Sequence, residues 1–142
     1  MIDNTFRTLP DRQHTGLMGS SMGGGVSLYA LFPRPDIFGF AGLMSPAFWW
    51  SEGTFLPWAA SLPFVGGRIY MDVGDNESRE IPGQKEVYLN DAIAMNALLR
   101  DKGYTDETLR FIVEAGGSHE ESAWARRLPE ALRFLLRPLM AT

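Results

Sequence analysis

Apolar runs that fit buried strands alternate along this chain with segments that fit helices. The strand-like runs span residues 14–20, 38–44, 68–73 and 108–114. The helical segments span about 24–32, 55–61 and 87–102, and a last one runs from about Glu120 with a second start at Pro129. Strands joined by helical crossovers predict a mostly parallel sheet of about four strands in a three-layer α/β/α fold.

Segment 87–102 has a clear helical period. Its apolar stripe recurs at spacings of four, three and four residues, at Tyr88, Ala92, Met95 and Leu99. Gly103 follows directly and is expected to end this helix as a left-handed C-cap.

A serine stands at the centre of a G-x-S-x-G pattern between the first strand and the first helix. Within Gly19-Ser20-Ser21-Met22-Gly23, only Ser21 has a glycine two residues away on both sides. A serine on such a sharp turn exposes its hydroxyl at a helix N-terminus, and flanking side chains would collide with the neighbouring strand and helix. We expect Ser21 to be a nucleophile and the Met22 N–H to bind the oxyanion. The alternative is an ordinary glycine-rich turn.

A serine nucleophile needs a base, and the chain has two histidines. His14 precedes the first strand, so it lies at the opposite end of the sheet from Ser21. His119 follows the fourth strand and shares the carboxyl edge with Ser21, where catalytic groups of open α/β sheets gather. We expect His119 to be the general base and His14 to have no catalytic role.

The acid that orients such a histidine is expected between the serine and the histidine, on the loop after the third strand. That loop carries three carboxylates: Asp75, Glu77 and Glu80. Asp72 is also near, but it lies within the strand, so its direction depends on the pleat. A solvated acidic turn is the alternative interpretation of this loop.

Composition narrows the chemistry that the chain can support. Its 142 residues are 45% hydrophobic and 21% charged, which fits a single domain, 1–142. The absence of cysteine excludes thiol catalysis and disulfides. The two histidines lie too far apart in sequence to favour a shared metal site. We expect neither a cofactor nor a metal.

Charge and hydropathy also exclude some partners. The net charge is −4 and no Lys/Arg cluster occurs, which argues against nucleic acid. No stretch approaches the roughly 18 apolar residues that span a bilayer. The first residues show no signal peptide. These features predict a cytoplasmic protein with no membrane partner.

Four motifs in order resemble the esterase D/enterochelin esterase-like group of α/β-hydrolases, a wider group that includes feruloyl esterases and mycolyltransferases. The motifs span residues 19–24, 45–50, 74–77 and 117–119, with Trp124 following. The resemblance implies a serine carboxylesterase without cofactor. It places the acid three residues after Gly74, on Glu77, and Asp75 remains the alternative.

The chain also departs from that group. Relatives carry four further strands before the nucleophile strand, and about 13 residues stand there in this chain. The resemblance therefore implies a truncated fold, the C-terminal half of an α/β-hydrolase, without the loop that supplies the second oxyanion N–H. We expect the first strand to be an exposed sheet edge and the chain to form a homo-oligomer, a dimer or tetramer.

Aromatic side chains cluster after the second strand. Trp49 and Trp50, with Phe48, Phe55 and Trp58 nearby, can wall an acyl or aryl pocket, as can Trp124. Such clusters also occur as core or as cover for a sheet face, and the sequence leaves both interpretations open.

The combined prediction is hydrolysis of small acyl or aryl esters through Ser21, His119 and Glu77 and an acyl-enzyme. Two alternatives are a non-catalytic remnant used for binding or assembly and an acyltransferase with the same nucleophile. Short-chain esters, aryl esters and siderophore lactones all remain open as substrates.

Overall fold

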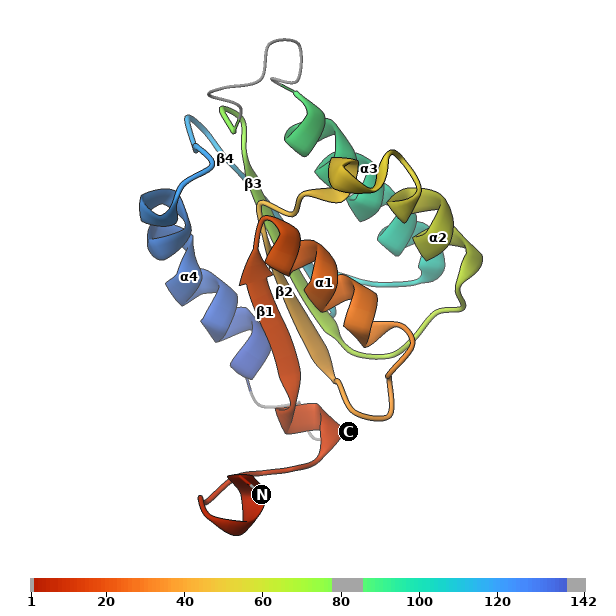
Figure 1. The fold of residues 1–142 in the computed structure, drawn as a ribbon, viewed down its shortest axis with the longest axis vertical. Coiled ribbons are helices and arrows are strands. Elements are labelled where there is room, and N and C mark those ends of the chain that lie inside the picture. The colour runs from red at the N-terminus through yellow and green to blue at the C-terminus, as the bar shows by residue number, and fades with distance from the viewer. Residues whose placement is uncertain (1, 78–85, 138–142) are drawn as a thin grey trace.

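Four parallel strands form the sheet, and their order in space is their order in sequence. In the computed structural model, which describes residues 2–77 and 86–137, the strands are β1 (Gly16–Ser20), β2 (Phe40–Met44), β3 (Arg68–Gly74) and β4 (Leu109–Glu114). Each pairs in parallel with the next, in the order β1-β2-β3-β4. All four carboxyl ends therefore lie at one edge of the sheet (Figure 1).

Helices cover both faces of this sheet. They are α1 (Met22–Leu31), α2 (Phe55–Ser61), α3 (Val87–Lys102) and α4 (Glu121–Leu136), with short 3-10 helices η1 (Ile2–Asn4), η2 (Arg12–His14) and η3 (Phe48–Ser51). Helices α1, α2 and α3 lie on one face and α4 lies on the other (Figure 1). The predicted three-layer α/β/α fold is confirmed.

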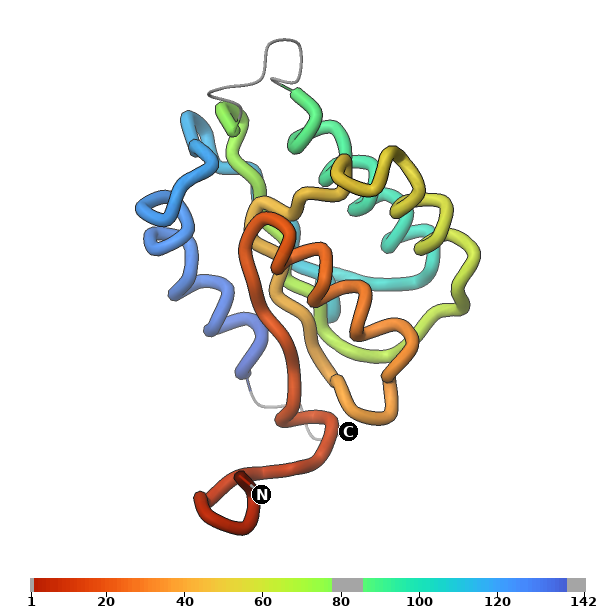
Figure 2. Tube along the Cα trace, in the orientation of Figure 1, coloured from red at the N-terminus to blue at the C-terminus, as the bar shows by residue number. Residues whose placement is uncertain are grey.

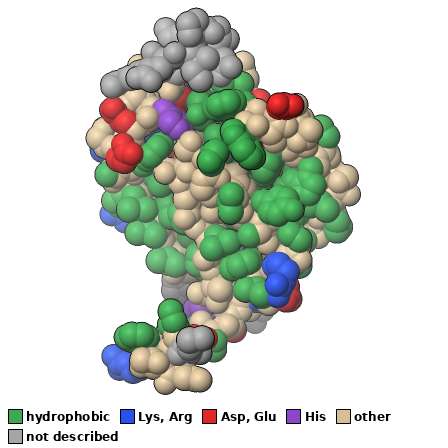
Figure 3. All heavy atoms as spheres, in the orientation of Figure 1, with side chains coloured by type: hydrophobic (Ala, Val, Ile, Leu, Met, Phe, Trp, Pro, Cys, Tyr) green, Lys and Arg blue, Asp and Glu red, His purple; other side chains and the backbone are tan. Residues whose placement is uncertain are grey.

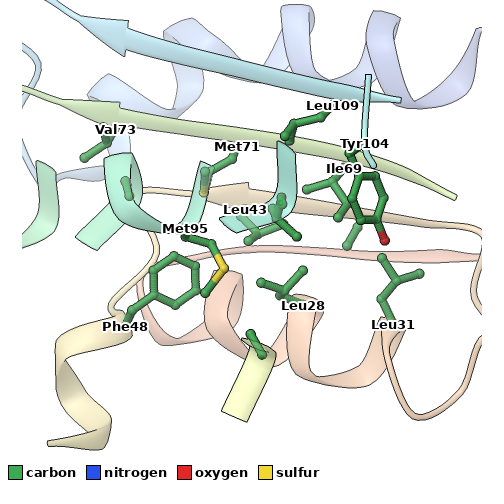
Figure 4. Close-up of a cluster of buried hydrophobic side chains, with 14 of the residues drawn as sticks. Leu28, Leu31, Leu43, Phe48, Ile69, Met71, Val73, Met95, Tyr104 and Leu109 are labelled. Carbon is green, nitrogen blue, oxygen red and sulfur yellow. The ribbon is translucent and has the colours of Figure 1, made fainter. Parts of the chain in front are cut away.

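The pleat of β3 divides the core between the two faces. Ile69, Met71 and Val73 belong to the larger apolar cluster, which is filled by α1, α2 and α3 (Figure 4). Tyr70 belongs to the smaller cluster under α4. Because successive side chains point to opposite faces, Asp72 also points to the α4 side.

Helices α2 and α3 have the bounds expected from the sequence, and all four apolar stripe residues of α3 are buried. Gly103 ends α3 with φ 113° and donates its N–H to the Arg100 carbonyl, as expected for a left-handed C-cap.

The first strand begins two residues later than expected. Arg12 to His14 form η2 because the Asp11 side chain accepts from the Gln13 N–H at 3.0 Å, and the Thr15 N–H bonds back to the Arg12 carbonyl. This local capping outweighs the strand pattern at position 14.

The expected second start at Pro129 is wrong. Helix α4 continues through Pro129 without a break. Proline removes one N–H bond, to the carbonyl four residues earlier at Ala125. Both residues lie on the exposed side of α4, while Ala131, Phe134 and Leu135 on the other side pack against the sheet. Burial of that face holds the helix together.

No helix in the described part of the chain is both long and apolar enough to cross a bilayer.

Strand β1 is an edge of the described sheet. Its only strand neighbour there is β2, and all five of its residues are half-buried. Helix α1 lies beside β1 (Figure 1). It exposes three apolar side chains, Met22, Val26 and Tyr29, and Val26 is 62% exposed. Unpaired strand edges and apolar stripes of this kind favour association with another chain.

We therefore expect a homo-oligomer at micromolar concentration, whose contact covers the β1 edge of the sheet or the faces beside α1. Light scattering measures the mass, and a stable monomer of the formula mass would contradict the prediction. Val26→Glu should lower the mass if α1 lies in the contact. Ile93→Glu, a matched change at a residue 47% exposed on α3, should not.

Candidate active site

Four polar side chains follow the four strand ends. Ser21 follows β1, Ser45 follows β2, Glu77 follows β3 and His119 follows β4. Backbone hydrogen bonds align these ends, because the Ser21 N–H donates to the Met44 carbonyl and the Ser45 N–H to the Asp72 carbonyl, each at 2.9 Å. The sheet edge therefore carries the polar groups that sequence analysis placed there, and Ser45 in addition.

Ser21 occupies a strained turn between β1 and α1, visible as a tight bend in Figure 2. Its φ is 54° and its ψ −121°, a conformation that non-glycine residues rarely adopt and that costs on the order of 1–3 kcal/mol. A Cβ on Gly19 would lie 2.7 Å from the Gly23 carbonyl carbon, so Gly19 is required. The expected collision at Gly23 is wrong, since a Cβ there meets nothing within 4 Å.

Met22 is the first residue of α1, so its N–H has no partner within the helix. The helix dipole adds partial positive charge at this position. The Met22 N–H can therefore stabilise negative charge that forms next to the Ser21 hydroxyl.

Glu77 and His119 are in direct contact. Glu77 Oε2 lies 2.6 Å from His119 Nδ1, and the Glu77 side chain is almost fully buried. The loops that carry them meet closely: a Cβ on Gly74 would lie 2.1 Å from the Gly117 carbonyl oxygen, and the Asn76 N–H donates to that oxygen at 2.9 Å. Only glycine at position 74 permits this approach.

Burial alone would raise the pKa of Glu77. Hydrogen bonds from His119, Ser45 and the Gly74 N–H outweigh burial and hold this pKa below the usual value of glutamate. Glu77 is then ionised at neutral pH and accepts only, so the proton of the shared hydrogen bond belongs to Nδ1 of His119. The lone pair of the neutral ring is on Nε2.

The other carboxylates near the loop that the structure describes, Asp75 and Asp72, do not contact His119. Asp75 accepts from the Gly116 N–H at 2.6 Å and so braces the turn after β4. Asp72 points toward α4 and forms an ion pair with Arg127, with 3.1 Å between Oδ1 and Nε. Glu80 lies outside the described residues.

Two aromatic rings flank His119. The Tyr88 ring centroid lies 4.4 Å from that of His119, and the Trp124 ring meets it edge-on at 5.1 Å. Trp49 packs against Tyr88 on the side of the large core. Trp124 therefore limits the motion of the His119 ring, and Trp49 limits that of the Tyr88 ring. Trp50 is not part of this aromatic group.

An apolar groove of about 560 Å³ begins beside Ser21. It lies between α1 and the segment of η3 and α2, on the face where Figure 3 shows hydrophobic side chains gathered. Its lining comprises Met22, Gly25, Val26, Tyr29, Ala47, Trp50, Ser51, Thr54, Phe55 and Trp58. Of the aromatic residues expected to wall a pocket, Trp50, Phe55 and Trp58 line this groove, whereas Phe48, Trp49 and Trp124 do not.

The described residues show no hydrogen bond between the Ser21 hydroxyl and the His119 ring. His14 pairs with Asp11 through Nδ1 before β1, at the opposite edge of the sheet. In residues 2–77 and 86–137, no three histidine or carboxylate side chains converge as a metal site.

Comparison with known proteins shows which family this chain belongs to. A family model described as "Putative esterase" matches residues 1–135, nearly the whole chain. The chain belongs to this esterase family. The resemblance predicted from the four sequence motifs is confirmed.

Three proteins illustrate what this esterase-family chain is similar to. It is 26% identical over 135 residues to the uncharacterized protein YbbA of Bacillus subtilis (strain 168), covering 95% of this chain and 54% of that protein. It is 29% identical over 136 residues to an endo-1,4-beta-xylanase/feruloyl esterase of Xylanibacter ruminicola, covering 96% and 16%. It matches the structure of Shigella flexneri enterochelin esterase with a TM-score of 0.76 and 26% identity, covering 94% and 33%. The chain therefore spans about half or less of the length of these proteins.

Sequence analysis missed two polar residues of the site, Ser45 and Arg127. The Ser45 hydroxyl donates to Glu77 Oε1 at 2.6 Å, and Arg127 Nη2 donates to the Ser45 oxygen at 2.7 Å. Ser45 stood at the start of a family-like motif, which was the available signal. Arg127 carried none, because its partner lies 82 residues earlier in the sequence.

Because Glu77 contacts His119 and Asp75 does not, substitutions at the two residues should affect activity differently. Glu77→Gln should lower kcat toward a p-nitrophenyl ester on the order of 10⁴-fold, because it removes the charge that orients the His119 ring. Asp75→Asn should cost less than about tenfold, because its amide oxygen can still accept from Gly116. Steady-state kinetics of both variants measure this, and a reversed order would contradict the assignment.

Proposed function

We propose that this chain hydrolyses carboxylic esters, with Ser21 as nucleophile, His119 as general base and acid, and Glu77 as the orienting carboxylate. The observation that carries the proposal is the 2.6 Å contact between Glu77 and His119 at the sheet edge where Ser21 occupies a strained turn. The esterase family and the similarity to an enterochelin esterase and a feruloyl esterase support the same reaction class.

The proposed reaction has two halves. His119 Nε2 takes the Ser21 proton as Oγ attacks the ester carbonyl, and the Met22 N–H stabilises the oxyanion. The tetrahedral intermediate collapses, the alkoxide leaves with the proton from His119, and an acyl-enzyme remains. Water then repeats the attack with His119 as base and releases the acid. A hydrogen bond between the Ser21 hydroxyl and His119 Nε2 must form when substrate binds, because catalytic hydrogen bonds are often long or absent in apo enzymes.

The apolar groove favours esters with an uncharged acyl or aryl group. Its first lining residue, Met22, directly follows Ser21, and the Ala47 N–H donates to the Ser21 carbonyl at 3.0 Å. An acyl group bound there lies against the rings of Tyr29, Phe55 and Trp58. Aromatic acids in the names of similar proteins, such as ferulic acid, are compatible with a groove of this chemistry.

Only one oxyanion donor is assigned in this proposal. In α/β-hydrolases, a second N–H that binds the oxyanion comes from a loop after an earlier strand of the sheet. Removal of one oxyanion donor lowers the rate on the order of 10²–10³-fold. We therefore propose modest turnover for the chain alone.

Labelling tests the nucleophile. A fluorophosphonate should modify Ser21, because capture requires an activated hydroxyl, and Ser21→Ala should abolish both labelling and turnover of p-nitrophenyl acetate. Peptide mapping by mass spectrometry locates the adduct. An adduct on Ser20 or Ser27, or full activity in Ser21→Ala, would reject the proposed function.

Chain-length preference tests the groove. Gly25 lines it, and a Cβ there meets only Phe55 Cε2, at 3.8 Å, so Gly25→Ala fits without strain. Gly25→Leu should fill the groove, lowering kcat/KM for hexanoate esters by about tenfold or more while sparing acetate esters, since each buried CH₂ contributes about 0.8 kcal/mol. Gly25→Ala is the matched control. Equal effects on both esters would show that the acyl group binds elsewhere.

A further inference from the structure

The Glu77 carboxylate is held by a second group of side chains on the face away from His119. We propose that Ser45 and Arg127 are positioning residues, which fix Glu77 so that Oε2 alone faces the histidine. The inference rests on the proposed function for its kinetic consequences, but its geometry stands on contacts that the serine reaction does not use.

The Ser45 hydroxyl has a fixed polarity. It is fully buried and lies within hydrogen-bond distance of Trp124 Nε1 at 3.0 Å, Arg127 Nη2 at 2.7 Å and Glu77 Oε1 at 2.6 Å. Indole and guanidinium nitrogens only donate, and a hydroxyl has one proton and two acceptor sites. The Ser45 proton must therefore point to Glu77, and all three bonding sites of the hydroxyl are used.

This polarity leaves Glu77 one orientation. Its Oε1 accepts from the Ser45 hydroxyl and from the Gly74 N–H. Its Oε2 accepts from His119. Rotation of the carboxylate would break charge-assisted hydrogen bonds, which are the stronger kind. Ser45 thus holds the carboxylate plane in the orientation that presents a single oxygen to His119.

Arg127 holds Ser45 in turn and balances the buried charge. The residue is 6% exposed, and its Nη1 donates to Glu114 Oε2 at 2.7 Å. Its Nε lies 3.1 Å from Asp72 Oδ1 and its Nη2 lies 3.8 Å from Glu77 Oε1. One guanidinium therefore faces three carboxylates, and its planar fork directs one N–H to Ser45.

The backbone at Ser45 gives an independent sign that its side chain matters. Its φ is 44°, in the left-handed region that favours glycine. Glycine there would remove the strain but also the hydroxyl. Strain of this kind clusters at functional sites.

The same face of α4 serves both the acid and the histidine. Trp124 and Arg127 are three residues apart, so they lie on one side of α4. Both donate to Ser45, and Trp124 also meets the His119 ring. The position of α4 is thereby coupled to the position of the acid–histidine pair.

Kinetics provide the first test. Ser45→Ala should lower kcat about 10- to 100-fold with KM changed less than about twofold, as expected for loss of a hydrogen bond to a charged group. The matched control is Ser27→Ala, because Ser27 is also buried and its hydroxyl donates to the Gly23 carbonyl at 2.8 Å. Equal losses in both variants, or a rise in KM alone, would overturn the inference.

A double-mutant cycle separates positioning from a general structural role. If Ser45 acts through Glu77, Ser45→Ala should cost less than about twofold when added to Glu77→Gln. A full independent loss in that background would overturn the inference.

Proton exchange at the histidine gives a readout that needs no turnover. In ¹⁵N-histidine-labelled protein, the His119 Nδ1 proton should be protected from water, and Ser45→Ala should speed its exchange at least tenfold. The exposed His14–Asp11 pair serves as an internal reference in the same spectra. An unprotected His119 proton in the unaltered protein, or an unchanged rate in Ser45→Ala, would overturn the inference.

Further variants keep the test decisive if Ser45→Ala does not fold. Ser45→Gly suits φ 44° and should also speed the exchange, as should Arg127→Lys, which keeps the charge but loses the fork. Arg126→Lys is the control, because Arg126 pairs with Glu114 but contacts neither Ser45 nor Glu77. Activity that survives Ser21→Ala would reject the proposed function, while the exchange rates would still decide the positioning role.

Discussion

The parallel register of four neighbouring strands is the constraint on which the site depends. Because all four strands run in one direction, residues that follow them meet at one edge although they lie up to 98 positions apart, as Ser21 and His119 do. Gly74, the last residue of β3, lies directly against Gly117 in the loop after β4. Without that approach, the Glu77 loop and the His119 loop would stand too far apart for their 2.6 Å contact.

Burying the charged groups of Asp72 and Arg127 under α4 costs free energy of folding. Burial raises the pKa of Asp72 to about 6, although Arg127 favours its ionised form. An acid whose pKa is raised on folding destabilises the fold as the pH rises through the range from about 4 to about 6. Glu77 acts oppositely, because its lowered pKa contributes stability above the usual glutamate range that is lost on acidification. Buried ion pairs are weak evidence for net stability, so the value of this cluster lies in its geometry.

Two strained residues, Ser21 and Ser45, mark the carboxyl ends of the first two strands. Both have positive φ without being glycine, which costs free energy that the surrounding structure must supply. The rigid sheet below them supplies the hydrogen bonds that hold these conformations, from Ser21 to Met44 and from Ser45 to Asp72. Each strained serine is therefore held by a backbone hydrogen bond to the neighbouring strand.

The sequence by itself determined the features that depend on local patterns. Period and capping signals predicted the bounds of α3 and the role of Gly103, and the order of strands and helices placed Ser21 and His119 at one sheet edge. The family-like register singled out Glu77, the carboxylate that contacts His119.

Tertiary structure alone decided the features that depend on distant partners. The pleat turned Asp72 away from His119, packing of α4 carried the helix through Pro129, and the groove took Trp50 but not Trp49 or Trp124. The roles of Ser45 and Arg127 could not be inferred, because a serine in a loop and an arginine on a helix gain meaning only from the atoms that burial brings beside them. Local sequence specifies backbone preference, but hydrogen-bond partners 32 and 82 residues apart are fixed only when the sheet and its helices have packed.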